Sequence, residues 1–221
     1  MSAVIQIPIF PLPDAVLFPD TVIPLHIFEP RYREMVRDCL AGDRRLAMAL
    51  LKPGWEKEYY GRPPVHPIAG AGEIVRHEEL PDGRFNILLR GTMRIGIQTE
   101  LPPDKSYRIV RARPLPDRYT DADSAVIAGR VERLKVFYLR ILSEVNKGQD
   151  EMARIFAGVK DAGAIADRIA AALFSDCETR QQVLERLEVP ARIAYVQEQL
   201  VNVLTHVSDR NTSVAKSRGD N

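Results

Sequence analysis

Two short stretches of the chain have glycine spacings that hold phosphate groups in other proteins. Gly91–Gly96 has the spacing of a P-loop, but Ile97-Gln98 stands where Lys and Ser or Thr would bind phosphate and magnesium. Gly70–Gly72 could begin a dinucleotide-binding loop, but Val75 stands in place of its third glycine. We therefore expect no nucleotide cofactor and no ATP hydrolysis by this chain.

Residues suited to acid–base, nucleophilic or metal chemistry are also poorly spaced. His77-Glu78-Glu79 begins like the helix of a zinc metalloprotease, but Pro81 replaces the second histidine and would break the helix. No GxSxG nucleophile turn is present. The histidines are His26, His66, His77 and His206, and the cysteines are Cys39 and Cys177. None is paired at metal-ligand spacing, so we expect structural or surface histidines, reduced thiols, no metal and no catalytic residue.

The charge balance also restricts the class of partner. The chain has 31 basic and 30 acidic residues, a net charge of +1, which does not indicate a general nucleic-acid or anionic-membrane binder. A set of arginines could contact RNA phosphates if it lay on one face: Arg84, Arg90, Arg94, Arg108, Arg111 and Arg113. We favour a solvated outer face with acidic neighbours, because aromatic residues are not interleaved for base stacking.

Membrane and export signals are not apparent in the sequence. The first ten residues carry no basic segment, and no window approaches the roughly 20 apolar residues of a membrane helix. We expect a cytoplasmic protein with no membrane partner.

The distribution of proline divides the chain near residue 117. Fifteen of the 16 prolines lie at or before Pro116, which predicts strands and turns first and helices afterwards. We expect a β-barrel subdomain over residues 1–117, a helical bundle over 118–208 and a disordered tail over 209–221.

Hydrophobic patterning places the elements within these parts. Strands are expected at 4–10, 21–27, 46–51, 72–80, 84–90, 93–98 and 107–112, and helices at 30–41, 121–145, 161–174 and from Pro190. Pro81-Asp82-Gly83 predicts a hairpin turn. In the strand that follows, Phe85, Ile87 and Leu89 share one face, and Leu88 is an apolar exception on the other. Ser175 and Glu178 match a helix capping box.

Three blocks of sequence together resemble one known family. The first contains Ile9-Phe10-Pro11-Leu12, Val16-Leu17-Phe18-Pro19 and the run Ile23-Pro24-Leu25-His26-Ile27-Phe28-Glu29-Pro30-Arg31-Tyr32. The second covers 72–75, 80–85 and 89–95, and the third covers 181–185 and 191–193. Together, over residues 5–207, they resemble the N-terminal substrate-binding domain of Lon proteases.

The resemblance implies a fold of the α+β class. It is a PUA-like β-barrel with one inserted helix, followed by a C-terminal α-helical bundle. It also implies a non-catalytic module that binds unfolded or specific client proteins, with a protease or chaperone as a further partner. The sequence has no Walker motif and no Ser–Lys peptidase segment, so we expect a stand-alone form that is not an enzyme. The alternative is an RNA-binding module that uses the PUA-like barrel.

The residues that carry the resemblance are interpreted mainly as structural. They are Phe18, Pro19, Pro24, His26, Phe28, Glu29, Arg31, Tyr32, Gly83 and Gly91. The prolines fix turns and strand ends, Phe18 and Phe28 are expected in the core, and Glu29 and Arg31 are expected to bond locally.

A long loop over residues 52–67 supplies the candidates for peptide binding. Trp55, Tyr59 and Tyr60 are our candidates, because aromatic residues on loops are enriched at interfaces. The alternative is a lid that closes over the barrel, and β-strand addition at an open barrel edge would leave no side-chain signature.

Overall fold

A computed structural model describes residues 3–58, 61–119, 124–145 and 156–219, with side chains described as far as residue 207. Contacts divide the chain into two compact units. The first comprises Met1–Pro116 and Phe174–Glu185, and the second comprises Asp117–Leu173 and Arg186–Asn221. The sheet and α5 therefore form one unit, although more than fifty residues of chain separate them.

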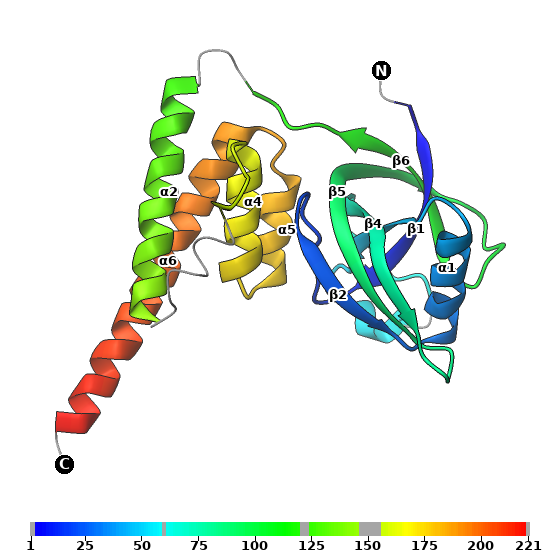
Figure 1. Cartoon of the computed structure of the whole chain (residues 1–221), viewed down its shortest axis with the longest axis horizontal. Helices are drawn as coiled ribbons and strands as arrows, with labels where there is room; N and C mark the ends of the chain where they lie inside the picture. Colours follow the sequence, from blue (N-terminus) through cyan, green and yellow to red (C-terminus); the bar gives the residue numbers. More distant parts are fainter. Residues whose placement is uncertain (1–2, 59–60, 120–123, 146–155, 220–221) are drawn as a thin grey trace. The chain divides into compact units, whose positions relative to one another are not determined.

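The first unit contains a mixed sheet of six strands (Figure 1). The strands are β1 (Ile5–Leu12), β2 (Val22–Ile27), β3 (Arg45–Leu50), β4 (Ile68–Glu79), β5 (Phe85–Glu100) and β6 (Arg108–Leu115). Their order is β2-β5-β4-β3-β1-β6, and β1 pairs with β3 in parallel while the other pairs are antiparallel. A further pairing of β5 with β6 closes the sheet on itself.

Strand β5 is long enough to pair with three neighbours. Its first half pairs with β2, its second half with β6, and β4 follows it along both halves. The prediction of two separate strands at 84–90 and 93–98 was wrong, because the chain continues to pair with β4 through Gly91. Gly91–Gly96 therefore lies inside a strand and forms no loop that could surround a phosphate.

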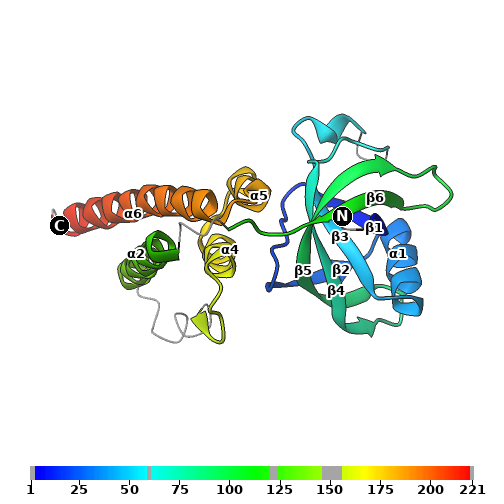
Figure 2. The same cartoon turned by 90° about the horizontal axis from the view of Figure 1, so that it is seen from above.

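One face of the sheet packs against α1 (Pro30–Ala41), as Figures 1 and 2 show. Met35, Val36 and Cys39 of α1 are buried with Leu46, Ile74 and other strand residues. The opposite strand face forms a second cluster rich in alanine, including Ala47, Ala49, Ala69, Ala71 and Ala112. This alternation of apolar residues between two faces follows from the two-residue period of a strand.

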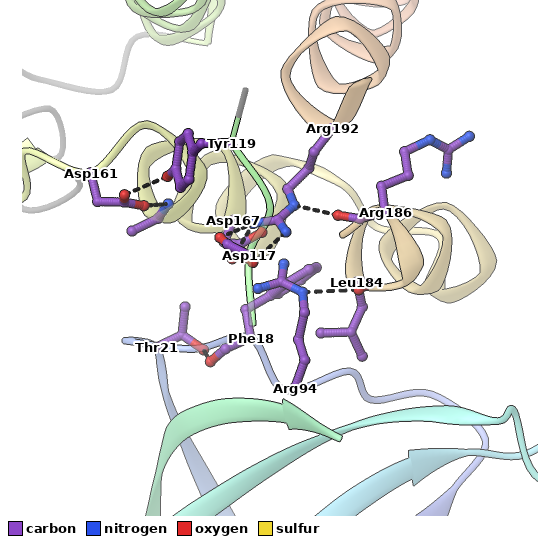
Figure 3. Close-up of polar contacts among 11 residues, drawn as sticks. Phe18, Thr21, Arg94, Asp117, Tyr119, Asp161, Asp167, Leu184, Arg186 and Arg192 are labelled. Atoms are coloured by element: carbon purple, nitrogen blue, oxygen red, sulfur yellow. Dashed lines mark hydrogen bonds and ion pairs between the residues drawn. The ribbon is translucent and has the colours of Figure 1, made fainter. Parts of the chain in front are cut away.

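Helix α5 (Cys177–Glu185) belongs to the sheet unit, whereas the sequence placed it in a helical part over 118–208. Three polar contacts explain the difference. Buried Arg94 of β5 donates from Nε to the Leu184 carbonyl at 2.9 Å (Figure 3), and Gln181 donates to the Ile68 carbonyl at 2.8 Å. His66 lies 3.2 Å from the Glu185 carboxylate. Hydrogen bonds to buried groups are costly to break, so they hold α5 on the sheet.

The residue that caps α5 is Asp176. Its Oδ2 accepts from the Thr179 backbone N–H at 2.8 Å and from the Thr179 hydroxyl at 2.6 Å. The capping box expected at Ser175 is therefore displaced by one residue, because the helix begins at Cys177.

Asp176→Ala is expected to lower the free energy of unfolding of the first unit by about 1 kcal/mol, the usual contribution of an N-cap. The hydrogen bonds from Thr179 hold the pKa of Asp176 below its ordinary value. The cap therefore stabilises fully above the unfolded-state pKa, near 4, and this contribution is lost as pH falls through the lower folded pKa. Urea unfolding followed by fluorescence of Trp55 at pH 7 and pH 2.5 measures this. Asp176→Asn keeps a capping oxygen without the charge, and a pH dependence equal to wild type in that variant would contradict the assignment.

The second unit is helical and contains α2 (Ser124–Glu144), α4 (Ala162–Leu173) and α6 (Val189–Gly219). Helix α2 packs along α6, and α4 packs against both (Figures 1 and 2). Helix α6 continues to Gly219 and so includes most of residues 209–221, for which the polar sequence predicts a disordered tail. None of the described helices is both long and apolar enough to span a bilayer.

An arginine without solvent exposure joins the segments of this helical unit. Arg192 of α6 forms paired hydrogen bonds with the carboxylate of Asp117, at 2.6 and 2.8 Å, and lies 3.4 Å from Asp167 (Figure 3). Its Nε donates to the Arg186 carbonyl at 2.8 Å. The charge of a buried guanidinium has to be compensated, and these two carboxylates compensate it.

Candidate functional site

An exposed surface of the closed sheet brings together apolar residues from distant parts of the sequence. Strand β2 turns Ile23, Leu25 and Ile27 toward the core and its intervening residues outward. We call the outward surface the β2 face; it consists of Val22, Pro24 and His26 of β2, Asn86 and Leu88 of β5, and Arg76 and Glu78 of β4. Val22 is 52% exposed, and Pro24 lies directly opposite Leu88. Leu88, the apolar exception in its strand, therefore extends an apolar row across two strands.

A chain of hydrogen bonds limits this row on one side. His26 Nδ1 lies 2.8 Å from Asn86 Oδ1, and the Asn86 amide donates to Glu78 at 3.2 Å. Arg84 Nη1 lies 3.3 Å from His26 Nε2, which fits an imidazole that carries its hydrogen on Nδ1. These contacts fix the orientation of His26 and Asn86, so the polar border of the β2 face is ordered.

The β2 face is hollowed by a cavity of about 400 Å³. Its lining is mostly apolar and comprises Pro24, Leu25, His26, Arg76, His77, Glu78, Asn86, Ile87 and Leu88. Among the described residues, Arg76 forms no ion pair, so its guanidinium is available at the border of the cavity. An apolar hollow with a few polar groups at its border is typical of sites that accept an apolar side chain.

The outer edge of β2 is open. The Thr21 carbonyl accepts from the Gly91 N–H at 2.8 Å, so alternation directs the backbone groups of Val22, Pro24 and His26 away from β5. Within the described part of the chain, no strand pairs with this edge. Pro24 has no N–H and so reduces by one the donors that the edge presents.

Several of the residues that carry the family resemblance lie on or beside the β2 face. Pro24 and His26 are exposed members of it, and Phe28, the next outward residue, is 60% exposed and stacks on His26 with ring centroids 6.3 Å apart. The prediction that Phe28 lies in the core was therefore wrong. The alternation that buries Ile27 turns Phe28 outward, and this signal was already present in the sequence.

Other members of this set support the framework beside the face. Phe18 is fully buried, and its carbonyl accepts from the Thr21 hydroxyl at 2.7 Å (Figure 3). Glu29 accepts from Arg31 at 3.0 Å, and Arg31 lies over the ring of Tyr32. Two further members hold tight backbone positions: Gly83 has a φ of 76° in the hairpin turn, and Gly91 lies against the Phe18 carbonyl. Pro19 is half-buried at the turn before β2.

The loop candidates for peptide binding lie elsewhere. Trp55 begins a short 3-10 helix, Trp55–Glu58, and is half-buried. Tyr59 and Tyr60 lie outside the described residues. Trp55 is not among the residues that line the cavity of the β2 face. The loop and the β2 face are therefore separate candidates for one function.

The arginines considered for RNA binding do not form one exposed stripe. Arg94 and Arg108 are buried, with Arg94 bonded to Leu184 and Arg108 to Glu100 and Pro63. Arg84 and Arg90 pair with Asp82 and Glu73. This leaves Arg111 and Arg113 exposed and without an acidic partner in the described part of the chain, which is a small basic area for a polyanion.

Groups suited to metal or thiol chemistry are not assembled. Within the described segments, no group of three or more His, Cys, Asp or Glu side chains could hold a metal ion. Cys39 is buried, and burial raises the pKa of its thiol to about 12, which keeps the thiol protonated.

The sequence profile of the substrate-binding domain of ATP-dependent protease La (Lon) matches residues 6–202. The chain belongs to this family. Relatives include Lon protease of Desulfosudis oleivorans, 26% identical over 194 residues, and Lon protease of Desulfovibrio desulfuricans, 27% identical over 198 residues. Each alignment covers 88% of this chain but only 23% and 22% of the respective relative, so the chain corresponds to under a quarter of those proteins.

Solved structures show the same fold. A Lon N-terminal domain protein from Xanthomonas campestris aligns with a TM-score of 0.59 at 22% identity. The N-terminal domain of Lon protease from the Mycobacterium avium complex aligns with a TM-score of 0.65 at 17% identity. Both alignments cover 90% of this chain and 98% of the other. The resemblance read from the sequence is thus confirmed, and the Lon-domain fold is the framework that carries the β2 face.

Proposed function

We propose that this chain recognises polypeptide substrates and that the β2 face is where an extended, apolar segment binds. The observation that carries the proposal is an apolar row beside the open edge of β2, formed by exposed Val22 and Pro24 and half-buried Leu88. Membership of a family named for substrate binding supports it. A contiguous exposed apolar surface is costly in water and is typical of an interaction site.

Strand addition gives this surface a specific binding mode. A polypeptide in an extended conformation pairs its backbone with the outward groups of Val22 and His26. Every second side chain of that polypeptide then faces the cavity at Pro24 and Leu88. Backbone pairing does not depend on sequence, whereas the cavity selects apolar side chains, so the mode fits many unfolded clients.

Leu88→Glu and Val22→Glu are expected to weaken binding of an unfolded polypeptide about tenfold. Each variant places a charge on the surface that the bound polypeptide would cover, where it would lose its contact with water. The probe is a fluorescent, reduced and carboxymethylated α-lactalbumin, followed by anisotropy; we expect a wild-type dissociation constant in the micromolar range. Val136→Glu is the matched control, since Val136 on α2 is 63% exposed and belongs to the second unit. An equal loss of affinity in all three variants, or no loss of affinity in any of them, would contradict the β2 face as the binding site.

Trp55→Ala tests the loop as the alternative location. If Trp55 contributes most of the contact, Trp55→Ala weakens the same anisotropy signal and Leu88→Glu does not. Failure of wild type to bind any unfolded polypeptide would remove both locations and the proposed function.

We also propose that the chain itself catalyses no reaction. Support comes from the glycine-spaced segment lying inside β5 and from the match to a substrate-binding domain alone. Purified protein incubated with fluorescent casein and ATP should give no release of peptide or phosphate, and turnover that follows the protein through purification would overturn this.

We further propose that the first unit is a PUA-like barrel. The closed sheet and the position of α1 in the chain, between β2 and β3, support this. The RNA-binding use of such a barrel is less well supported, because the arginines are divided between buried and ion-paired positions. We propose client proteins as the partners, with a protease or chaperone acting on the bound client.

A further inference from the structure

A second cavity in the first unit, of about 330 Å³, has a lining of different chemistry. Its lining residues are Arg31, Tyr32, Gly61, Arg62, Pro103, Lys105, Ser106, Tyr107 and Arg108. Four of these are cations and none is acidic. The proposed polypeptide site uses none of them, so the cavity is a separate feature of the same unit.

Carboxylates that are not part of the lining hold three of the cations in place. Glu29 accepts from Arg31 at 3.0 Å, and Asp38 lies 3.0 Å from the Lys105 ammonium. Arg108, whose side chain is 10% exposed, donates to Glu100 at 2.7 Å and to the Pro63 carbonyl at 2.8 Å. The cationic groups are thus positioned before any ligand arrives, which lowers the entropic cost of binding.

The fourth cation retains unused donors. Arg62 uses Nη1 for both Glu100 and the Leu101 carbonyl, each at 3.2 Å. In the described structure its Nε and Nη2 donate to no group. A guanidinium with two adjacent free donors matches the spacing of two oxygens on a carboxylate or phosphate.

The surrounding charges restrict the size of the ligand. Glu29, Glu34, Asp38 and Glu100 together offset the four cations, so the neighbourhood has no large net charge. A long polyanion lying over this surface would meet the carboxylates as well as the cations. A small anion inside the cavity would meet the cations first, and charge interactions there are screened less than on the open surface.

We propose that this cavity binds a small phosphorylated anion through Arg62, Lys105 and the fixed guanidiniums of Arg31 and Arg108. The phosphoryl oxygens accept hydrogen bonds from Arg62 and Lys105, and the ring of Tyr107 forms part of the wall. The recognised group is a phosphate or diphosphate, either free or as part of a nucleotide.

The test is calorimetric titration of the whole chain with sodium pyrophosphate at constant ionic strength. We expect a dissociation constant below about 1 mM, and at least a roughly tenfold increase in Arg62→Ala/Lys105→Ala. Both replaced side chains are partly exposed, at 36% and 45%, so the variant should retain its fold, which circular dichroism verifies. Arg111→Ala/Arg113→Ala is the matched control, because it removes the same charge from exposed positions outside the lining.

Parallel titrations distinguish the sources of the anion. Equal affinity for pyrophosphate and ADP supports the diphosphate group alone as ligand, and tighter binding of ADP supports a nucleotide. No measurable heat with any of these, or equal loss of affinity in the two double variants, would overturn the proposal. Tighter binding of single-stranded RNA than of pyrophosphate, lost in the Arg111/Arg113 control, would also overturn it in favour of a polyanion surface.

Discussion

Gly91→Ala should lower the free energy of unfolding of the first unit by about 3 kcal/mol, at the upper end of the cost of overpacking. A Cβ at this position would lie 2.0 Å from the Phe18 carbonyl oxygen. That oxygen belongs to backbone in a fully buried segment, so no side-chain rotation can relieve the clash. The segment before β2 must shift instead, and the β2 face would shift with it.

Urea unfolding of Gly91→Ala followed by fluorescence measures this loss, because Trp55 is the single tryptophan and lies in the first unit. Gly129→Ala is the matched control: a Cβ there meets nothing within 4 Å, and the residue lies in α2. We expect that change to stabilise the helix by about 0.5–1 kcal/mol. A Gly91→Ala midpoint equal to wild type would show that the close approach to Phe18 is not required.

Arg192→Ala should destabilise the second unit by about 3–5 kcal/mol, the cost of removing one member of a buried ion pair. Asp167 is 1% exposed and would lose the cation 3.4 Å away, and the Arg186 carbonyl would lose its donor. Asp117 is 25% exposed, so water can solvate its carboxylate in part. The loss of this compensating cation beside the buried Asp167 therefore accounts for most of the expected effect.

Circular dichroism at 222 nm during urea unfolding reports mainly on α2, α4 and α6 and so measures this change. Arg118→Ala is the control, because its ion pair with Glu188 is exposed at 62% and 58% and should contribute at most about 1 kcal/mol. Arg192→Ala/Asp167→Asn should recover part of the loss by removing the buried charge. If the double variant were less stable than Arg192→Ala alone, the charge argument would be incorrect.

Together, Gly91→Ala and Arg192→Ala test whether polypeptide binding depends on the first unit and not on the second. If the β2 face binds polypeptide, a folded Gly91→Ala protein should bind it more weakly, since Gly91 fixes the segment that leads into β2. Arg192→Ala should leave that binding unchanged while the first unit remains folded, because Arg192 belongs to the second unit.

Local pattern in the sequence was sufficient for much of the framework. The two-residue alternation of Phe85, Ile87 and Leu89, and the turn at Gly83, predicted the hairpin that the structure contains. The family followed from the residues around Pro24 and Phe28, and the profile match confirms it. The prediction that Phe28 lies in the core rested on its apolar side chain, whereas the strand alternation that buries Ile27 turns Phe28 outward.

By itself, the sequence determined the family and the local elements, because strand period, turn residues and helix starts depend on neighbours a few positions apart. The tertiary structure alone decided which distant residues share a surface. The pairing of β2 with β5 sets Pro24 beside Leu88, and Arg94 and Gln181 bring α5 to the sheet. The cavity that collects Arg31, Arg62, Lys105 and Arg108 likewise depends on strand register and loop closure, which no local pattern encodes.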